Sequence, residues 1–338
     1  MATATARHGL ALTRTRPGVR TVTAGDHQAF LAGRLTPRDR WLARLLADHK
    51  VLTTDQIIQL GWPTRRAANH RLRRLYLWRV LDRFQPLVPT GAAPAHYVLD
   101  VAGAGVLAHE DGLDPDQTGY RHDRALGIAH SPRLAHTLAV NNVFVSLIAH
   151  ARQPGATGTL TAWWSETRCL HAVGDLARPD AYGAWREHGT DIGWYLELDR
   201  GTEPLRRLAA KLTDYHALAT TTGTVTPVLV WLPSAQRETG ARRALTEALA
   251  DLDRPATVPV ATTATDLVPP GARHDPAAAR WLPLTPRATP GRLRLTDLAH
   301  AWPHLRPASQ TDPPARPGKL APAPPMPPDP ASYPPESR

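Results

Sequence analysis

Cysteine, lysine and long apolar runs are all scarce in this sequence. Cys169 is the single cysteine among 338 residues, which excludes an internal disulfide and a cysteine-based zinc site. No continuous apolar run approaches the roughly 18 residues of a membrane span, so we expect no membrane segment. The N-terminus is rich in Thr, Ala and Arg and lacks the apolar stretch of a signal peptide. These absences predict a cytoplasmic protein.

Acidic residues are scarce in the first hundred positions. Residues 1–100 contain 16 Lys and Arg, 6 Asp and no Glu, whereas the other 238 residues carry 24 charges of each sign. The whole net charge of +10 therefore lies in the first hundred residues. Such a distribution predicts a basic module that binds a polyanion, namely double-stranded DNA, joined to a neutral second module.

Apolar periodicity is almost absent near the C-terminus. Between Pro303 and Arg338 stand 13 of the 34 prolines, a composition typical of disordered or polyproline segments. The sequence predicts an α+β chain with a disordered basic arm, a winged helix-turn-helix domain, a linker, an α/β domain and a disordered Pro-rich tail. Their predicted ranges are 1–34, 35–109, 110–130, 131–285 and 286–338.

Helix-start signals organise the predicted DNA-binding domain. Thr36-Pro37 begins one helix, Thr53 with Gln56 forms a capping box for a second, and Thr64 begins a third. Residues 79–84 and 95–99 flank a Pro- and Gly-containing turn and predict a two-stranded wing. Three short helices followed by a wing predict a winged helix-turn-helix.

The third predicted helix has one apolar and one basic face. Ala68, Leu72 and Leu75 recur at helical spacing, and the polar residues share the opposite side. The residues that we expect to read bases are Arg65, Arg66, Asn69 and His70. Those that we expect to bind phosphates are Arg73, Arg74 and, on the wing, Arg83. The alternative is a small helical domain whose arginines are merely solvated.

The second module alternates helices and strands. A helical pattern from Pro132 to Arg152 precedes strand-like segments at 159–164, 179–185 and 191–199. A helix from Pro204, a buried strand at 225–232 and a helix at 235–252 follow. This order predicts a mixed sheet covered by helices.

Acidic residues gather on one face of the third of these strands. Glu197 and Asp199 alternate with apolar residues and so lie on the same side. If the preceding strand pairs as a hairpin, Asp180 lies beside Glu197. Asp180 and Glu197 then form a predicted binding site for Mg²⁺ or Mn²⁺. Lys211, one of only three lysines, could reach these acids from the following helix and stabilise a reacting phosphate.

These residues resemble the PD-(D/E)xK nuclease fold. The family's PD motif corresponds to Pro179-Asp180, and its second acid corresponds to Glu197. The resemblance implies a catalytic set of Asp180, Glu197, Asp199 and Lys211. The chain departs from the family at position 199, where the family has lysine and this chain has aspartate. Either Lys211 supplies the positive charge from the following helix, or the site has lost its chemistry.

A longer set of motifs resembles the replication-relaxation family of plasmids and integrative elements in Gram-positive bacteria. It comprises HTLAVN (136–141), RPDAY (178–182), YLELDRGTEPLRRLAAKLTDY (195–215) and PVLVWLP (227–233), within residues 35–285. The resemblance implies a DNA-binding accessory protein of plasmid replication, relaxation or transfer, acting with other plasmid proteins, whose second domain is nuclease-like. Two alternatives remain: an active Mg²⁺-dependent nuclease or nickase, and a transcriptional regulator with a C-terminal interaction domain.

Overall fold

The structure, a computed structural model, describes residues 25–269, 271, 274–284, 291–302, 304–305 and 318–329. The chain divides into two compact units, the first reaching Leu138 and the second beginning at Ala139. A three-stranded sheet lies in the first unit and a six-stranded mixed sheet in the second. The fold is therefore α+β, as the sequence predicts. Residues 1–24 of the predicted arm lie outside the described residues.

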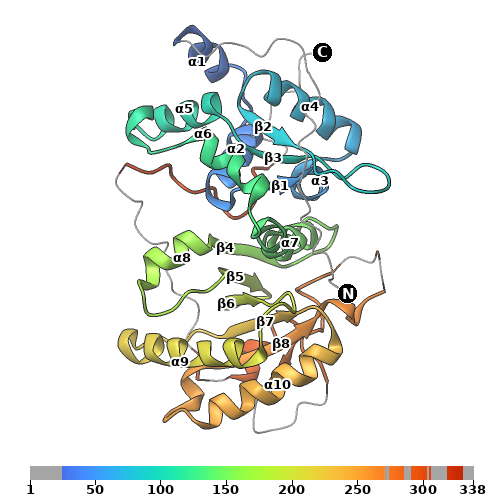
Figure 1. Cartoon of the computed structure of the whole chain (residues 1–338), viewed down its shortest axis with the longest axis vertical. Coiled ribbons are helices and arrows are strands. Elements are labelled where there is room, and N and C mark those ends of the chain that lie inside the picture. The colour runs from blue at the N-terminus through green and yellow to red at the C-terminus, as the bar shows by residue number, and fades with distance from the viewer. Residues whose placement is uncertain are drawn as a thin grey trace, which may run out of the picture. The chain divides into compact units, whose positions relative to one another are not determined.

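The first unit contains the three predicted helices and the two strands predicted to form a wing (Figure 1). Its main elements are α1 (Gly25–Ala32), α2 (Pro37–His49), β1 (Leu52–Thr53), α3 (Thr54–Gly61), α4 (Arg65–Leu77), β2 (Leu81–Phe84), β3 (His96–Leu99) and α5 (Val101–Glu110). The side chains of Thr36, Thr53 and Thr64 each accept a backbone N–H bond at the start of α2, α3 and α4. These caps set where the three helices begin.

The sheet of the first unit has one strand more than the predicted wing. Its order is β1-β3-β2, with Leu52 opposite Tyr97 and Leu81 opposite Leu99, both pairs antiparallel. Strand β1 is only two residues long, too short to show a periodicity in the sequence. The pairing of β1 with β3 connects the segment between α2 and α3 to the two strands predicted as a wing.

Two segments that the sequence assigns to an arm and a linker are ordered. Residues 25–32 form α1, in which Leu31 is fully buried. The predicted linker contains η1 (Pro115–Gln117), α6 (His122–Gly127) and η2 (Ile128–His130). Ala129, at its end, packs in a cluster with Val51 and Val98. Apolar residues within a polar stretch account for both helical segments, because their burial outweighs the local composition.

The second unit is built around its mixed sheet (Figure 1). Its elements are α7 (Leu134–Ala151, which begins in the first unit), β4 (Thr159–Ser165), α8 (Glu166–Val173), β5 (Ala181–Glu187), β6 (Thr190–Leu198), α9 (Leu205–Thr222), β7 (Val228–Leu232), α10 (Ala235–Ala250), β8 (Val260–Ala264), β9 (Leu282–Pro283) and α11 (Leu298–Ala301). The strand order is β4-β5-β6-β7-β8-β9. Strands β6, β7 and β8 are parallel and the other pairs antiparallel.

Helix α7 packs on one face of this sheet. The ring of Phe144 is parallel to those of Trp163 and Trp194, with centroids 5.2 and 6.4 Å away. A Cβ at Gly183 would lie 2.7 Å from Phe144 and 2.6 Å from Trp194, so only glycine fits there. The wide aromatic contact fixes the helix to the sheet.

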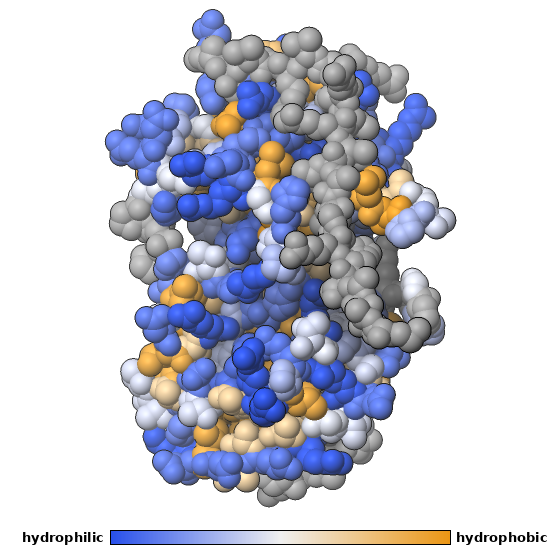
Figure 2. Space-filling view, viewed as in Figure 1, coloured by the Kyte–Doolittle hydropathy of each residue, from blue (hydrophilic) through white to orange (hydrophobic). Residues whose placement is uncertain are grey.

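Helix α7 is also the one described helix that is long and apolar enough to cross a membrane, by length and composition. Of that stretch, 44% is buried within the structure, and Val145, Leu147 and Ile148 are fully buried. A core helix of a soluble protein has the same properties. Figure 2 shows one face of the molecule, on which hydrophilic residues dominate and apolar residues form small separate patches. Both observations are consistent with a soluble protein.

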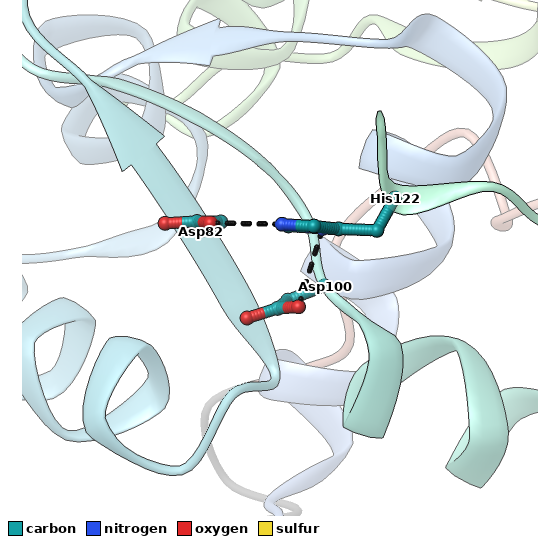
Figure 3. Close-up of side chains that lie close together, drawn as sticks. All are labelled: Asp82, Asp100 and His122. Atoms are coloured by element: carbon teal, nitrogen blue, oxygen red, sulfur yellow. Dashed lines mark ion pairs between the residues drawn. The ribbon is translucent and has the colours of Figure 1, made fainter. Parts of the chain in front are cut away.

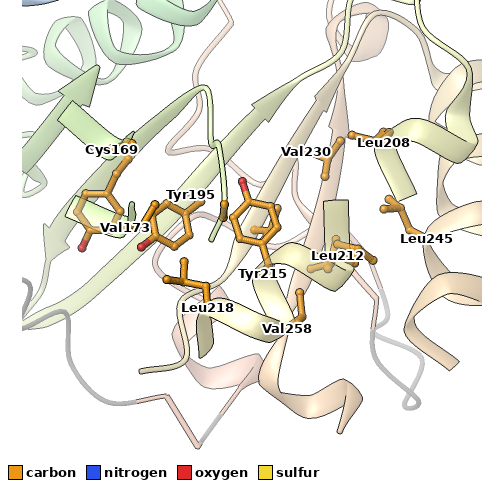
Figure 4. Packing of buried hydrophobic residues seen from close by; sticks show 14 of the residues in the cluster. Cys169, Val173, Tyr195, Leu208, Leu212, Tyr215, Leu218, Val230, Leu245 and Val258 are labelled. Carbon is orange, nitrogen blue, oxygen red and sulfur yellow. The ribbon is translucent and has the colours of Figure 1, made fainter. Parts of the chain in front are cut away.

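The opposite face of the sheet carries α8, α9 and α10. Leu208, Leu212 and Tyr215 of α9 pack with Val230 of β7 and Leu245 of α10 in one buried cluster (Figure 4). Apolar residues three and four apart on α9 produce this contact. It places Lys211, between Leu208 and Leu212 in sequence, near strand β6.

Part of the predicted tail belongs to the fold of the second unit. Leu295, Leu298 and Trp302 are buried, and Leu293 pairs with Trp281. Arg294 and Thr296 donate to the buried carboxylate of Glu187, over 2.8 and 2.7 Å. The ordered part of the second unit therefore extends beyond the predicted boundary at residue 285. Residues 306–317 and 330–338 of the tail lie outside the described residues.

Candidate functional site

The exposed face of α4 carries most of the residues predicted to bind DNA. Arg66, Asn69, His70 and Arg73 are exposed. Their side chains make no hydrogen bond or ion pair with any described residue. Arginine and asparagine side chains that no protein group occupies can bond to base edges or phosphates without losing an internal contact.

The other three predicted DNA-binding residues have contacts within the protein. Arg65 pairs with Asp55 at 2.5 Å, and both side chains remain about half exposed. The guanidinium of Arg74 lies 4.8 Å from the ring centre of Trp78, and that of Arg83 lies equally far from Tyr76. The ring contacts orient both arginines. They do not neutralise the positive charge of Arg74.

Helix α4 is held in place by a buried ion pair that the sequence analysis did not identify. Arg71 is 7% exposed and donates to both carboxylate oxygens of Asp39, which is 1% exposed. Asp39 also closes the capping box of α2 with Thr36. Arg71 stands among four other arginines of α4, and only its place on the apolar side of the helix distinguishes it from them. The pair fixes α4 against α2 and so fixes the direction of the exposed side chains.

The predicted acidic site lies where β5 begins and β6 ends. The backbone N–H of Asp180 donates to Leu196 O at 3.0 Å, and Leu198 N–H donates to Asp180 Oδ2 at 2.8 Å. Asp180 is therefore beside Glu197, on the neighbouring strand. The negative charge of Asp180 is near enough to raise the pKa of Glu197.

Glu197 is buried and both of its carboxylate oxygens are bonded. Lys211 Nζ lies 2.5 Å from Oε2, and the hydroxyl of Tyr215 donates to Oε1 over 2.5 Å. Burial, followed by the charge of Asp180, raises the pKa of Glu197 to about 7, against the opposing effect of Lys211. Burial lowers the pKa of Lys211, but Glu197 and Asp180 raise it by more. The lysine thus reaches the acid from the helix.

Asp199 belongs to a different set of contacts. Arg237 of α10 donates to both of its carboxylate oxygens, and Gly201 N–H donates to Oδ1 at 2.9 Å. Asp199 follows the end of β6, and Arg237 of α10 reaches it there. The structure therefore brings Asp180, Glu197 and Lys211 together and pairs Asp199 with an arginine. Tyr215, one helical turn after Lys211, is the member that sequence reasoning missed.

The chemistry of Asp180 and Glu197 suits a hard cation, since Mg²⁺ and Mn²⁺ prefer carboxylate oxygens and take one or two of them together with substrate phosphates. Both oxygens of Glu197 already accept hydrogen bonds. A cation would bind here only if Lys211 or Tyr215 released one of these oxygens. The two carboxylates therefore have the chemistry of a divalent-metal site. A bound metal ion would compete with Lys211 for Glu197.

Asp82, Asp100 and His122 form a second cluster, in the first unit (Figure 3). His122 Nε2 lies 3.1 Å from Asp82 and Nδ1 lies 3.3 Å from Asp100. A single ion would bind one ring nitrogen, whereas here each nitrogen faces a different acid. Asp100 Oδ1 also caps α5 by accepting the Val101 N–H. The cluster ties the start of α6 to β2 and α5.

Comparison with known protein families gives a match. The family model of the replication-relaxation proteins matches residues 44–229, more than half of the chain. No curated protein and no solved structure matches. The matched range covers the helices of the first unit from within α2 onward, and Asp180, Glu197 and Lys211 in the second. The chain belongs to the replication-relaxation family.

Proposed function

We propose that the protein binds double-stranded DNA through the exposed face of α4 and serves plasmid replication, relaxation or transfer in the cytoplasm. Membership of the replication-relaxation family implies a role in replication or relaxation, and involvement with DNA or the replication machinery. We additionally assign the DNA contact to helix α4. The partners would be duplex DNA and other plasmid replication or transfer proteins.

The observation that carries this proposal is the contrast within α4. Arg71 is buried and paired with Asp39, whereas Arg66 and Arg73 are exposed and have no acidic partner among the described residues. The order helix, strand, two helices and two further strands supports a winged helix-turn-helix. In helix-turn-helix proteins the second helix of the motif enters the major groove. Here that helix is α4, with Arg66 and Asn69 near its N-terminus.

The test is a binding titration of the full chain with labelled duplex DNA, read by fluorescence anisotropy. We expect Arg66→Ala and Asn69→Ala each to weaken binding at least several-fold, since a good side-chain contact to a base contributes roughly 1–3 kcal/mol. Arg206→Ala is the matched control, because Arg206 is an exposed arginine of α9. Unchanged affinity in both α4 variants would refute the proposed interface.

A second candidate function is metal-dependent DNA cleavage by the second unit. Apart from α8, which lies between β4 and β5, the order α7, β4, β5, β6, α9 and β7 is that expected of a PD-(D/E)xK nuclease, and Lys211 contacts the acid Glu197. Asp180 and Glu197 would hold Mg²⁺ or Mn²⁺, which would polarise the phosphate. Lys211 would then stabilise its negative charge, and Asp199 would act indirectly by holding Arg237.

Cleavage is tested by incubating supercoiled plasmid DNA with the protein and Mg²⁺ or Mn²⁺. Nicking that disappears in Glu197→Gln and Lys211→Met, but persists in Arg206→Met, would support the nuclease. If DNA is bound but never nicked with either metal, the second candidate function is wrong and the first stands.

A further inference from the structure

A cavity of about 300 Å³ lies in the second unit, at the carboxyl ends of the parallel strands β6 and β7. Its walls come from α7, from the residues that follow these strands and from the segment around His274. In open α/β sheets this edge is the usual place for ligands. Small-molecule sites begin at roughly this volume, so the cavity has the position and size of a site for one small ligand.

Three polar side chains of the cavity lack partners. Asn142 and Ser146, four residues apart on α7, are partly buried, and neither side chain bonds to any described residue. His274 Nδ1 is buried and also has no hydrogen-bond partner. A buried polar atom is nearly always bonded, which makes His274 Nδ1 the exception at this cavity. One buried unbonded nitrogen, beside an amide and a hydroxyl that no described residue bonds, indicates a polar molecule that bonds to them.

The rim of the cavity is positively charged. Arg200 is exposed and has no acidic partner within the described part of the chain, whereas the neighbouring Asp199 is neutralised by Arg237. This arrangement favours a ligand with a negative group at the rim. A phosphate is such a group, because arginine binds it by charge and by paired hydrogen bonds.

Aromatic rings line the interior. Trp231 and His274 lie with ring centres 6.1 Å apart and nearly perpendicular. Burial, and next the charge of Arg280, lower the pKa of His274, so its ring is neutral at pH 7. A neutral imidazole, an amide and a hydroxyl can each both donate and accept hydrogen bonds. Together with the rings they suit a flat heterocycle with donors and acceptors on its edge.

We propose that this cavity binds a single nucleotide, with its phosphate at Arg200 and its base among Asn142, Ser146 and His274. A free nucleoside monophosphate and the terminal nucleotide of a DNA strand share this chemistry. The residues that line the cavity include none of α4 and none of Asp180, Glu197 and Lys211. Failure of either function proposed above would therefore leave the nucleotide site untouched, and failure of the nucleotide site would leave both functions untouched.

Calorimetric titration of the full chain tests the site with deoxyadenosine monophosphate, deoxyadenosine, and a single-stranded hexanucleotide with or without a 5′ phosphate. We expect the monophosphate to bind and deoxyadenosine to bind about tenfold more weakly, the effect of one lost charge-assisted contact. Arg200→Ala and Asn142→Leu should each weaken binding by about the same factor. Arg206→Ala should leave it unchanged.

Binding of the phosphorylated hexanucleotide alone, with the same response to the variants, would identify a strand end as the ligand. Absence of binding by both phosphorylated probes would overturn the proposal. So would binding that Arg200→Ala and Asn142→Leu both leave unaltered. Arg200 is exposed, so its replacement tests the site even if Asn142→Leu lowers the melting temperature.

Discussion

Lys211 Nζ lies 2.5 Å from Glu197 Oε2. The positive charge beside this acid of strand β6 therefore comes from a side chain of helix α9. The PD-(D/E)xK pattern that the sequence resembles would place that lysine on the strand itself, at position 199. Here the same charge reaches the acid from α9, and position 199 is an aspartate that binds Arg237. The contact depends on how α9 packs on the sheet, through Leu208 and Leu212.

Glu197 makes stability depend on pH. Its pKa is raised from an ordinary value of 4.5 to about 7, so the folded protein holds a proton that the unfolded chain releases between these pH values. Stability is therefore expected to fall as pH rises from 4.5 to 7, by on the order of 3 kcal/mol from this group. Glu197→Gln should remove this contribution. Urea unfolding of both proteins at pH 5 and 7.5 measures it, and parallel pH profiles would contradict it.

Glu197 and Lys211 should be energetically coupled. Lys211→Met leaves a buried carboxyl without its cation, whereas the same change in a Glu197→Gln background removes no ion pair. We expect a coupling energy of about 1–3 kcal/mol from a double-mutant cycle at pH 8, measured by urea unfolding. Because Lys211 is partly exposed, the value should be smaller than for a fully buried pair. Strict additivity of the two changes would argue against the contact.

Two arginines of α4 should differ sharply in their effect on stability. Arg71→Met leaves Asp39 buried and unpaired, which costs roughly 3–5 kcal/mol. Arg73→Met, two residues later and exposed, should change the free energy of unfolding by no more than about 0.5 kcal/mol. Urea titrations of both variants compare them directly. Equal losses would mean that α4 is not oriented by the pair with Asp39.

DNA binding by α4 should depend on salt in a specific way. If Arg73 binds a phosphate, Arg73→Ala should reduce the slope of log K against log salt by about 0.9, and should weaken binding equally for all duplex sequences. Asn69→Ala should change affinity for the preferred sequence and leave the slope intact. Anisotropy titrations between low and moderate salt distinguish the two. Identical slopes for wild type and Arg73→Ala would exclude the phosphate contact.

Removal of the segment after β9 should destabilise the second unit. A chain ending at residue 290 loses the buried Leu295, Leu298 and Trp302, and with Arg294 and Thr296 it loses two hydrogen-bond donors to Glu187. Burial of one such side chain contributes roughly 1.5–3 kcal/mol. A chain ending at residue 305 keeps all of them and should retain the stability of the second unit. Thermal unfolding compares the two, and equal melting temperatures would show that the segment contributes nothing.

The sequence predicts best the features that depend on local spacing. The caps at Thr36 and Thr53 follow from neighbouring residues, and the approach of Lys211 to Glu197 follows from strand alternation and helical period. The Asp199–Arg237 pair joins residues 38 positions apart, and nothing local distinguishes Arg237 from other arginines. Cys169 and Val173 are the two buried residues of α8, too few for a clear periodicity. The sequence assigns residues 291–302 to the tail, because proline-rich composition masks the spacing of Leu295, Leu298 and Trp302.

The late position of residues 292–302 has a consequence during synthesis on the ribosome. Strands β4 to β8 emerge first, yet Glu187 has no arginine or threonine partner until Arg294 and Thr296 are made. Until then the nascent second unit carries an unpaired acid and an uncovered apolar patch, which are features of aggregation-prone intermediates. The second unit can therefore reach its final fold only after translation has passed residue 302.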